Sequence, residues 1–335
     1  MKIIKGSEVK FTGQSHTFSG TALPDVSVLL PTYNRTNALL RTLNALEKQS
    51  LSVELFEIIV VDDGSSDNTP EVLKQFSERT NTRFSYTVLK ENGGPAKARN
   101  TGLFMARGGV VLIIGDDIEP DVSLLEKHLS FHKKKSDEEY ALLGHVAFPK
   151  ELASSTFMNW LETDGRKYFF NYAELVAGEE AEPIFFYTCN VSVKLSLLNK
   201  SGWFDESFPY ASHEDLELGY RLADKGMRLV YDPDAKGYHW HLLTIQGIAR
   251  RVYLMGYSAE IFWRKIGDGS SGVKRITRKV LTTVCSLPPM VYLWNRLQAK
   301  EYDETKKYPG QWNMLLFLGF FIGLGDSQKN RKVRL

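Results

Sequence analysis

The sequence has little of what marks a secreted or membrane-spanning protein. Its 335 residues include only two cysteines, Cys189 and Cys285, which are too far apart for a disulfide framework or a metal-knuckle spacing. The first 24 residues contain no continuous apolar core of a secretory signal. No apolar run approaches the roughly 20 residues that cross a bilayer. The nearest run, 314–324, is short and contains glycines. These absences predict a reducing, cytoplasmic location.

An excess of charge of either sign is also missing. The chain carries 42 Lys and Arg against 40 Asp and Glu, a formal net charge of +2. Proteins that bind nucleic acid through its phosphates usually carry a strong positive excess, so no nucleic-acid partner is expected. The apolar content of 43% is ordinary for a globular protein. The length allows one large domain, or one domain with a substantial appendage.

Short apolar segments rich in β-branched residues alternate with amphipathic segments between residues 26 and 114. Turn-forming residues bound each apolar segment, which is typical of buried parallel strands. The expected strands are 26–30, 57–61, 84–89 and 110–114, and the expected helices are 36–49, 69–79 and 95–106. This alternation predicts an α/β fold in which helices cover both faces of a parallel sheet.

The pattern changes after residue 120. The expected elements there are helices at 121–132 and 213–225 and strands at 141–148, 189–193 and 228–231. The aromatic residues of 157–187 either shape a ligand cleft or belong to the core. Beyond residue 241 the chain reads as helical and basic. The predicted division is an extension over 1–24 with at most one edge strand, an α/β domain over 25–241 and a helical region over 242–335.

Acidic pairs follow two of the expected strands directly. Asp62 and Asp63 come after the second strand, and Asp116 and Asp117 come after the fourth. Ligands of open α/β sheets bind outside the carboxyl ends of the strands. Adjacent carboxylates repel one another unless a cation or strong donors offset the charge, and Mg²⁺ and Mn²⁺ prefer such oxygen ligands. The pairs therefore indicate a site for a divalent cation and a phosphorylated or polyhydroxylated ligand. The alternatives are an acidic surface turn at 116–117 and a turn that caps a helix at 62–67, where Asp67 suits the N-cap.

Two further loops follow strands and suit a nucleotide. In the loop 31–35, Tyr33 could stack on a base and Arg35 could reach a phosphate, or the loop is an ordinary turn with Thr36 as N-cap. The glycine turn at 92–94 opens a helix whose N-terminus suits an anion. That helix carries Lys97 and Arg99, which could equally be solvated charges.

The segment 212–218 has two interpretations. With Ser212 as N-cap, Glu214 and Asp215 fall in the first turn of a helix, where the helix dipole favours negative charge. A carboxylate in this position could also act as a general base. Further on, His239 and His241 would point to one face of an extended segment, and they either complete a metal shell or are structural.

Together these segments resemble the family 2 glycosyltransferases of the GT-A fold. The matching segments, in the family's order over residues 24–242, are 28–35, 60–67, 94–100, 115–117, 186–190, 202–206 and 213–215. The resemblance implies a Rossmann-like, mostly parallel sheet flanked by helices. It also implies metal-dependent, inverting transfer of a sugar from a nucleoside diphosphate, expected to be UDP, as in polysaccharide and cell-envelope biosynthesis. Residues 25–120 would then bind the donor and residues 121–241 the acceptor.

The resemblance also implies roles for individual residues. The donor would be bound by Pro31, Tyr33, Arg35, Asp62, Gly94, Lys97, Arg99 and Asp116. Asp117, with His239, would hold Mn²⁺ or Mg²⁺. Asp215 would be the base, with Glu214 beside it. All these groups would have to meet in one cleft around the diphosphate. One departure concerns residue 115, where the family often has the first aspartate of Asp-x-Asp and this chain has Gly115. The departure bears on metal affinity.

Two other functions share some of these features. A sugar nucleotidyltransferase would need a glycine-rich, arginine-bearing loop after the first strand, where this chain has 31–35. A non-catalytic sugar-nucleotide or glycan-binding protein would fit Gly115, but it would have no need for Asp117, Glu214 and Asp215 together.

The C-terminal region supports two interpretations as well. The apolar stretches 281–294 and 314–324 and the basic residues near the end suit a peripheral membrane contact through 281–335, at the inner face of the plasma membrane. A lipid-linked or glycan acceptor would agree with this location. Alternatively, the region is a helical cap that buries Trp294, Trp312 and Phe317 against the catalytic domain or against a second subunit of a homo-oligomer.

Overall fold

The computed structural model of the chain describes residues 8–15, 22–152, 155–267, 269, 271–303 and 305–334. The chain forms two compact units. The first, called the sheet unit, consists of Met1–Phe148, Leu175–Glu206 and Leu218–His241. The second, called the helical unit, consists of Pro149–Glu174, Ser207–Glu217 and Leu242–Leu335. The predicted division at residues 24 and 241 stays a prediction, and the segments 149–174 and 207–217 group with the C-terminal helices.

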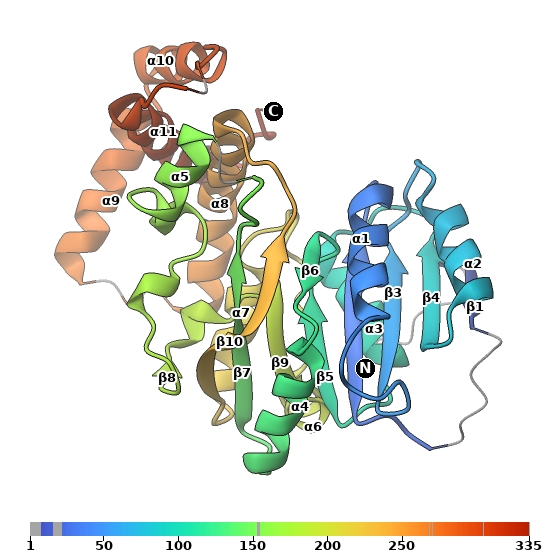
Figure 1. Cartoon of the computed structure of the whole chain (residues 1–335). Coiled ribbons are helices and arrows are strands. Elements are labelled where there is room, and N and C mark those ends of the chain that lie inside the picture. The colour runs from blue at the N-terminus through green and yellow to red at the C-terminus, as the bar shows by residue number, and fades with distance from the viewer. Residues whose placement is uncertain are drawn as a thin grey trace. The chain divides into compact units, whose positions relative to one another are not determined.

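The sheet unit is built on one large sheet with a parallel core (Figure 1). Its strands lie in the order β1 (Val9–Gln14), β4 (Arg83–Leu89), β3 (Phe56–Asp62), β2 (Val26–Thr32), β5 (Val110–Ile114), β9 (Asn190–Lys194), β7 (Tyr140–Ala147), β10 (Arg228–His239) and β6 (Ile118–Pro120). The four strands from β4 to β5 run parallel, β9 is antiparallel to both neighbours, and β1 is an antiparallel edge strand. The short β8 (Glu180–Ala181) pairs with β10.

Helices occupy the connections that the sequence predicted and one that it missed. They are α1 (Thr36–Leu46), α2 (Thr69–Arg79), α3 (Pro95–Met105), α4 (Leu124–Lys134), α6 (Leu195–Ser201) and α7 (Glu214–Ala223), with a 3-10 turn at Pro183–Phe185. Every residue of β3 and β5 is buried, as expected for strands that are covered on both faces. The predicted fold class is confirmed, and α2 and β5 have the predicted bounds. The sequence missed α6 and β6.

The predicted N-caps are displaced by one residue. Arg35 occupies the N-cap of α1 and Asn68 that of α2, and neither uses its side chain to cap. Asp67 nevertheless ties both helix starts together. Its Oδ2 accepts hydrogen bonds from the backbone N and Oγ1 of Thr36, and its Oδ1 accepts from those of Thr69. One carboxylate thus satisfies N–H groups at two helix N-termini.

Strand β10 is longer than predicted because a bulge interrupts it without ending it. The sequence suggested a strand that stops at Tyr231, since Asp232 and Pro233 read as a turn. In the structure Asp232 is opposite Gly144 of β7 and Lys236 is opposite His145, so three extra residues bulge out on β10. Beyond the bulge the strand continues and pairs with β6 on its other side. Such bulges redirect a strand at functional edges.

The helical unit has a core of its own. It contains α5 (Thr156–Glu162), α8 (Ile245–Ile266), α9 (Gly272–Cys285), α10 (Pro288–Gln298) and α11 (Pro309–Gln328), with 3-10 turns at Arg166–Tyr168 and Tyr172–Glu174. Helices α8 and α11 approach closely where glycines have no side chain. A Cβ on Gly256 would lie 1.9 Å from the Phe320 carbonyl oxygen, and one on Gly323 would lie 2.0 Å from that of Tyr253. Among the described residues, no helix has both the length and the apolar content to cross a bilayer.

Tryptophans fill this core. Trp294 and Trp312 are each 1% exposed, and Trp312 contacts Phe157 and Trp160 of α5 with ring centres 5.3 Å apart. Core packing therefore accounts for the first aromatic residues of 157–187. Phe317 is 38% exposed, so the interpretation that Phe317 is buried together with the two tryptophans is wrong for this chain by itself.

The basic C-terminal tail is partly neutralised within the helical unit. Asp326 of α11 is 1% exposed. Its carboxylate accepts two hydrogen bonds from Arg334, at 2.6 and 2.9 Å, and one from the Tyr253 hydroxyl at 3.0 Å. Arg331 lies 3.5 Å away. Because a buried carboxylate needs such partners, two of the tail's cations stabilise the fold at this point.

A buried polar network joins α4 to the sheet. The Asn190 amide nitrogen donates to two backbone carbonyls, so its Oδ1 must accept from Nε2 of His128 at 3.0 Å. Nδ1 of His128 then accepts from the Ser192 hydroxyl at 2.7 Å, and that oxygen accepts from Nε2 of His132 at 2.8 Å. His128 must be neutral in order to accept at Nδ1, and burial keeps His132 neutral as well. Burial lowers the pKa of His128 to about 4 and that of His132 to about 3.

We expect this network to make the protein sensitive to acid. In the unfolded chain both histidines take up protons near their ordinary pKa of 6.5, whereas in the folded state they do not until the pH is far lower. Stability should therefore fall as the pH drops below about 6.5, by on the order of 2 kcal/mol for each histidine at about pH 5. Urea unfolding across this range measures the loss. His132→Phe removes one of the two titrating groups and should flatten the profile, and an unchanged slope would contradict this account.

Candidate active site

The carboxyl ends of β2, β3 and β5 bring polar side chains together. Thr32, the last residue of β2, is opposite Asp62 at the end of β3. The Thr32 hydroxyl donates to Oδ2 of Asp116 at 2.7 Å, just beyond the end of β5. All three residues are buried. The acidic residues that follow separate strands in the sequence therefore meet at one edge of the sheet, with Thr32 between them.

Arg35 holds the second acidic pair together. Its Nη1 lies 3.3 Å from Oδ1 of Asp116 and also donates to Oδ2 of Asp117. The two carboxylates are 6% and 8% exposed, whereas the Arg35 side chain is 42% exposed. A cation at the mouth of the site thus offsets two buried like charges. The hydroxyl of Thr42 supports the same turn by donating to the Asp116 carbonyl at 2.9 Å.

The pairing of β6 with β10 brings two histidines to Asp117. His239 is opposite Ile118 in this antiparallel pair, and the backbone N of Trp240 donates to the Asp117 carbonyl at 2.9 Å. Nε2 of His239 lies 3.4 Å from Oδ2 of Asp117, and Nδ1 of His241 lies 3.7 Å from the same oxygen. Residues more than 120 positions apart in the sequence are therefore neighbours.

The two aspartates differ in their readiness to ionise. Burial raises the pKa of Asp116 to about 6, and the charge of Asp117 adds to the effect, while Arg35 and Thr32 oppose it. Burial acts on Asp117 in the same direction, but hydrogen bonds from His239 and His241 and the charge of Arg35 hold its pKa well below the ordinary value. Asp117 is thus the firmly charged member of the pair, as a metal ligand must be.

The group around Asp117 fits a metal that is shared with a ligand. Among the described residues, no three acidic, histidine or cysteine side chains are arranged to hold an ion by themselves. Mg²⁺ and related ions are usually bound through one or two carboxylates together with substrate phosphates. Asp117 and His239 supply a carboxylate and an imidazole at an open edge of the sheet, so substrate oxygens would complete the shell.

Gly115 leaves room for Asp117. A Cβ at position 115 would lie 2.9 Å from Oδ1 of Asp117 and 3.1 Å from the Ile118 side chain. An aspartate there, as in the family's frequent pattern, would displace the Asp117 carboxylate from this position. The observed position of the Asp117 carboxylate therefore depends on the absence of a side chain at position 115.

The two aspartates of the first acidic pair, Asp62 and Asp63, have different hydrogen-bond partners, which the sequence did not reveal. The two oxygens of Asp63 accept from the backbone N–H groups of Gly93 and Gly94, at 2.8 and 2.7 Å. In Asp62, Oδ1 accepts from the Ser65 N–H at 2.9 Å, while Oδ2 is buried and has no hydrogen-bond partner within the described part of the chain. Burial raises the pKa of both, that of Asp63 to about 6. Asp63 holds a loop in place, whereas Asp62 has one carboxylate oxygen without a partner.

The loop after β2 is fixed to the loop after β3. Oδ1 of Asn34 accepts from the Ser66 N–H at 2.8 Å, and the Asn34 N–H donates to Oγ of Ser65 at 2.8 Å. Tyr33 is 45% exposed beside these contacts, and Pro31 is half-buried within β2. The ring of Tyr33 is therefore accessible to a flat ligand.

The glycine turn before α3 is less open to an anion than predicted. Gly94 is the N-cap of α3, and its N–H is already used by Asp63. Nothing lies within 4 Å of the position that its Cβ would take. Lys97 lies 3.7 Å from the Glu8 carboxylate, and the guanidinium of Arg99 lies 5.2 Å from the ring centre of Phe204. Whether these residues contact a donor stays a prediction.

Glu214 and Asp215 begin α7, in the first helical turn as predicted. Glu214 is 3% exposed, whereas Asp215 is half-buried and accepts the N–H of Leu216 at 2.9 Å. Ser212, the expected N-cap, lies one residue further out and its Oγ is 2.8 Å from Nδ1 of His213, which has a positive φ of 69°. Both carboxylates belong to the helical unit, and Asp62, Asp116 and Asp117 belong to the sheet unit. Their convergence on one cleft stays a prediction.

Other residues near the site were not singled out from the sequence. The guanidinium of Arg41 lies 4.0 Å from the ring centre of Trp240 and 3.5 Å from Glu119. This stack fastens α1 to the segment that carries His239. Thr32 could have been found as a hydroxyl at the end of a strand, but nothing local in the sequence pairs Arg41 with Trp240.

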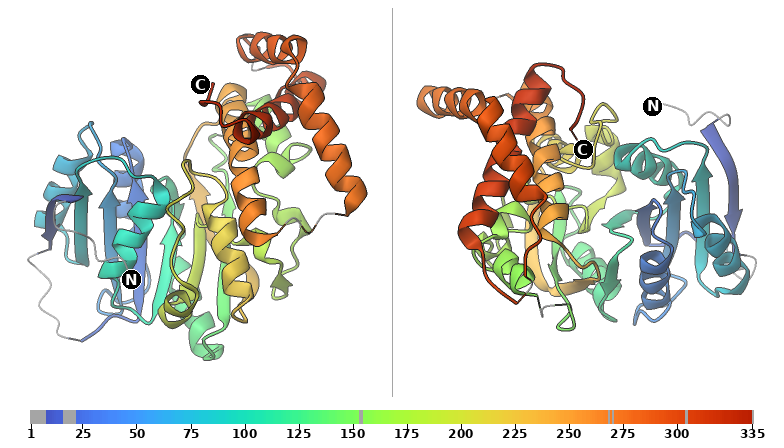
Figure 2. Two further views of the ribbon diagram at one scale, coloured as in Figure 1. Left: turned by 180° about the vertical axis from the view of Figure 1, so that it is seen from behind. Right: turned by 90° about the horizontal axis from the view of Figure 1, so that it is seen from above.

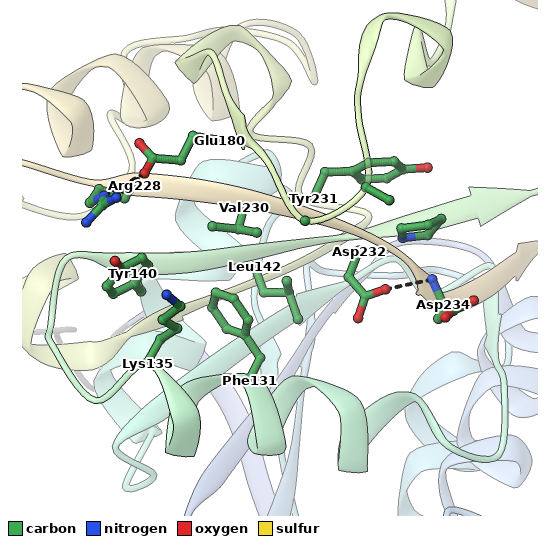
Figure 3. Close-up of a pocket in the computed structure, with 13 residues that line it drawn as sticks. Phe131, Lys135, Tyr140, Leu142, Glu180, Arg228, Val230, Tyr231, Asp232 and Asp234 are labelled. Atoms are coloured by element: carbon green, nitrogen blue, oxygen red, sulfur yellow. Dashed lines mark hydrogen bonds and ion pairs between the residues drawn. The ribbon is translucent and has the colours of Figure 1, made fainter.

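A separate cavity of about 390 Å³ lies in the sheet unit, where β7 and β10 begin (Figure 3). Phe131 of α4 and Lys135, the residue after this helix, line one side of it, and Tyr231 and Asp232 of β10 line the other. Its lining contains none of the predicted site residues. The cavity is at the opposite end of these strands from His239, so it is distinct from the candidate active site.

Comparisons with known proteins connect the chain with a family. Residues 27–173 match the family model described as glycosyl transferase family 2. Validoxylamine A glucosyltransferase of Streptomyces hygroscopicus subsp. jinggangensis is 29% identical over 236 residues. That match covers 64% of this chain and 55% of the relative, so the chain spans about half of the relative's length.

Two solved structures share the fold. The mannosyltransferase PcManGT from Pyrobaculum calidifontis, in complex with GDP-Man and Mn²⁺, has a TM-score of 0.60 at 20% identity, covering 93% of this chain and 89% of that one. TarS 1-349 of S. aureus, in complex with UDP-GlcNAc, has a TM-score of 0.51 at 18% identity, covering 92% and 93%. At these identities the likeness concerns the fold alone.

The different roles of Asp62 and Asp63 can be tested by a matched pair of variants. Asp63→Ala removes two hydrogen bonds to a carboxylate and should lower the unfolding free energy by about 2 kcal/mol. Asp62→Ala removes one and relieves a buried charge, so its cost should stay below about 1 kcal/mol. Asp62→Ala should instead weaken nucleotide binding. Urea unfolding and nucleotide titration measure both effects, and equal stability losses would count against the assignment.

Proposed function

Since the chain belongs to glycosyl transferase family 2, we propose that it transfers a sugar from a nucleoside diphosphate to an acceptor hydroxyl with inversion. The GT-A type of fold, predicted from the sequence, is confirmed by the structural likenesses. The observation that carries the proposal is the cluster of Arg35, Asp116 and Asp117 with His239 at the carboxyl edge of the sheet. A glycan or a lipid-linked sugar is the proposed acceptor.

The proposed donor is a UDP-sugar, and Asp62 is compatible with this choice. Its partnerless buried Oδ2 needs a hydrogen-bond donor. The ring N–H of uracil supplies one, as do the ring N–H of guanine and the amino groups of guanine, adenine and cytosine, so Asp62 fits uracil without selecting it. Tyr33 would stack on the base, Asp116 would accept from a ribose hydroxyl, and Arg35 would reach the diphosphate. Arg35 already lies at the mouth of the site, half-exposed and close to both carboxylates.

Asp117 and His239 would hold the divalent cation. When bound, the ion stabilises the charge that develops on the departing nucleoside diphosphate. A mixed carboxylate and imidazole set favours Mn²⁺ over Mg²⁺, which prefers oxygen ligands. In the absence of a donor, Arg35 compensates the charge of Asp117.

Asp215 is the proposed general base. It would take the proton of the acceptor hydroxyl as that oxygen attacks the sugar from the face opposite the leaving group. Asp215 is half-buried, so an acceptor can reach it. The neighbouring Glu214 is 3% exposed and is assigned a supporting role beside it. The family match and the loop 31–35 argue against a sugar nucleotidyltransferase.

We expect Asp215→Asn to separate binding from chemistry. The variant should bind the donor with unchanged affinity but lose on the order of 10²-fold or more in turnover, since an amide cannot accept the proton. Thermal shift with a panel of nucleotide sugars and Mn²⁺ identifies the donor, and turnover is then measured with it. Asp224→Asn, an exposed position just after α7, is the matched control. Full turnover in Asp215→Asn would remove this residue from the mechanism, and donor binding without turnover in the wild type would favour a non-catalytic binding protein.

Removal of metal should abolish transfer. With EDTA we expect activity to disappear, because the ion is needed to stabilise the charge that develops on the departing diphosphate, and we expect Mn²⁺ to restore it more fully than Mg²⁺. Asp117→Asn should raise the Mn²⁺ concentration needed for half-maximal donor binding. Unchanged activity in EDTA would contradict the metal role of Asp117 and His239.

A further inference from the structure

Helix α9 of the helical unit exposes its most apolar face. Four of its residues, spaced three or four positions apart, and the residue that precedes α10 form one strip, here called the α9 stripe: Val273, Ile276, Val280, Val284 and Leu287. Their exposed fractions are 74, 64, 55, 45 and 50%. On the opposite side of α9, Thr282 and Cys285 are buried.

This arrangement reverses the usual one. A helix on the surface of a globular protein buries its apolar face and turns polar residues to solvent. In the views of Figures 1 and 2, α9 runs along the outside of the helical unit, and no other described element of that unit covers its outer side. Tyr292 of α10, 64% exposed, adds to the uncovered apolar surface. Contiguous apolar surface of this kind marks an interaction site.

The charges next to the stripe are all of one sign. Between residues 271 and 300 the sequence has no aspartate or glutamate, but it has six cations: Lys274, Arg275, Arg278, Lys279, Arg296 and Lys300. The guanidinium of Arg278 lies 3.9 Å from the ring centre of Trp263 and so packs inward. Lys274, Arg275 and Lys279 are exposed.

From these observations we propose that α9 lies in the plane of an anionic lipid bilayer, with the α9 stripe among the acyl chains and the exposed cations at the headgroups. An apolar face with lysine and arginine beside it is what binds such a surface. A helix of 14 residues is about 21 Å long and does not need to span the bilayer. The contact is parallel to the membrane and reversible.

A second copy of the chain is a poorer partner. A two-fold contact through the α9 stripe would place the same cations opposite one another. The segment 271–300 has no acidic residue to pair with them. A bilayer containing anionic lipid supplies both the apolar layer and the opposite charge.

The proposed contact overlaps the region 281–335 that the sequence suggested, but it leaves out the C-terminal tail. Arg331 and Arg334 of the tail are engaged by the buried Asp326. Trp294 and Trp312 are in the core. The surface that remains begins at residue 273, before the region 281–335.

Vesicle binding by the full-length protein tests the proposal without donor or acceptor, and therefore independently of glycosyl transfer. The wild type should float with vesicles that contain phosphatidylglycerol, bind much less to pure phosphatidylcholine, and dissociate at high salt. The double variant Ile276→Asp and Val280→Asp should lose at least about tenfold in binding to anionic vesicles. Both positions are more than half exposed, so the fold should tolerate the change.

Two further variants separate the contributions. Reversing Lys274, Arg275 and Lys279 to Glu should cost about fivefold in binding for each removed cation, and only on anionic vesicles. Val176→Asp, at a 57% exposed position of the sheet unit, is the matched control and should bind like the wild type. Wild-type binding by the Ile276→Asp and Val280→Asp variant would overturn the proposal. The proposal would also be overturned if the wild type does not bind vesicles. If light scattering then shows a wild-type dimer and a monomeric Ile276→Asp and Val280→Asp variant, the partner of the α9 stripe is a second copy.

Discussion

Repulsion between Asp116 and Asp117 is the constraint around which the site is organised. Two adjacent carboxylates, both nearly excluded from solvent, would each suppress the ionisation of the other. Arg35 faces both, and the histidines at 239 and 241 face only Asp117. The result is one carboxylate that stays ionised and one that can exchange a proton near neutral pH. The loops after β2, β5 and β10 are needed together to produce this difference.

Hydrogen bonds between loops hold the residues of the candidate active site in place. Asp63 fastens the turn before α3, Asn34 joins the loops after β2 and β3, and Asp67 joins the starts of two helices. Each contact uses a side chain to satisfy backbone N–H groups that the strand and helix ends leave without partners. The exposed Tyr33 and the buried, partnerless oxygen of Asp62 are therefore next to loops that these contacts hold in place.

Much of this could be predicted from the sequence because it depends on local pattern. Apolar runs located β2, β3 and β5, and the acidic residues after them were recognised as one edge of a sheet. What failed needed information from distant residues. The bulge after Asp232 was predicted as the end of a strand. No local signal shows that Asp63 holds the turn before α3, and none pairs Arg331 and Arg334 with Asp326 of the apolar helix α11. No periodicity indicates that Asn190 orders the protons of two buried histidines.

The number of residues in the β10 bulge determines which face of the sheet the later side chains of the strand occupy. Pro233 and Asp234 reach the surface, where single-residue deletions are commonly tolerated. Side chains of a strand alternate between its two faces, so losing one residue there would turn every later side chain to the other face. Trp240 would then take the place of His239 beside Asp117, although no residue of the site had been replaced. Relatives that keep this site should therefore vary the composition of residues 233–235 and conserve their number.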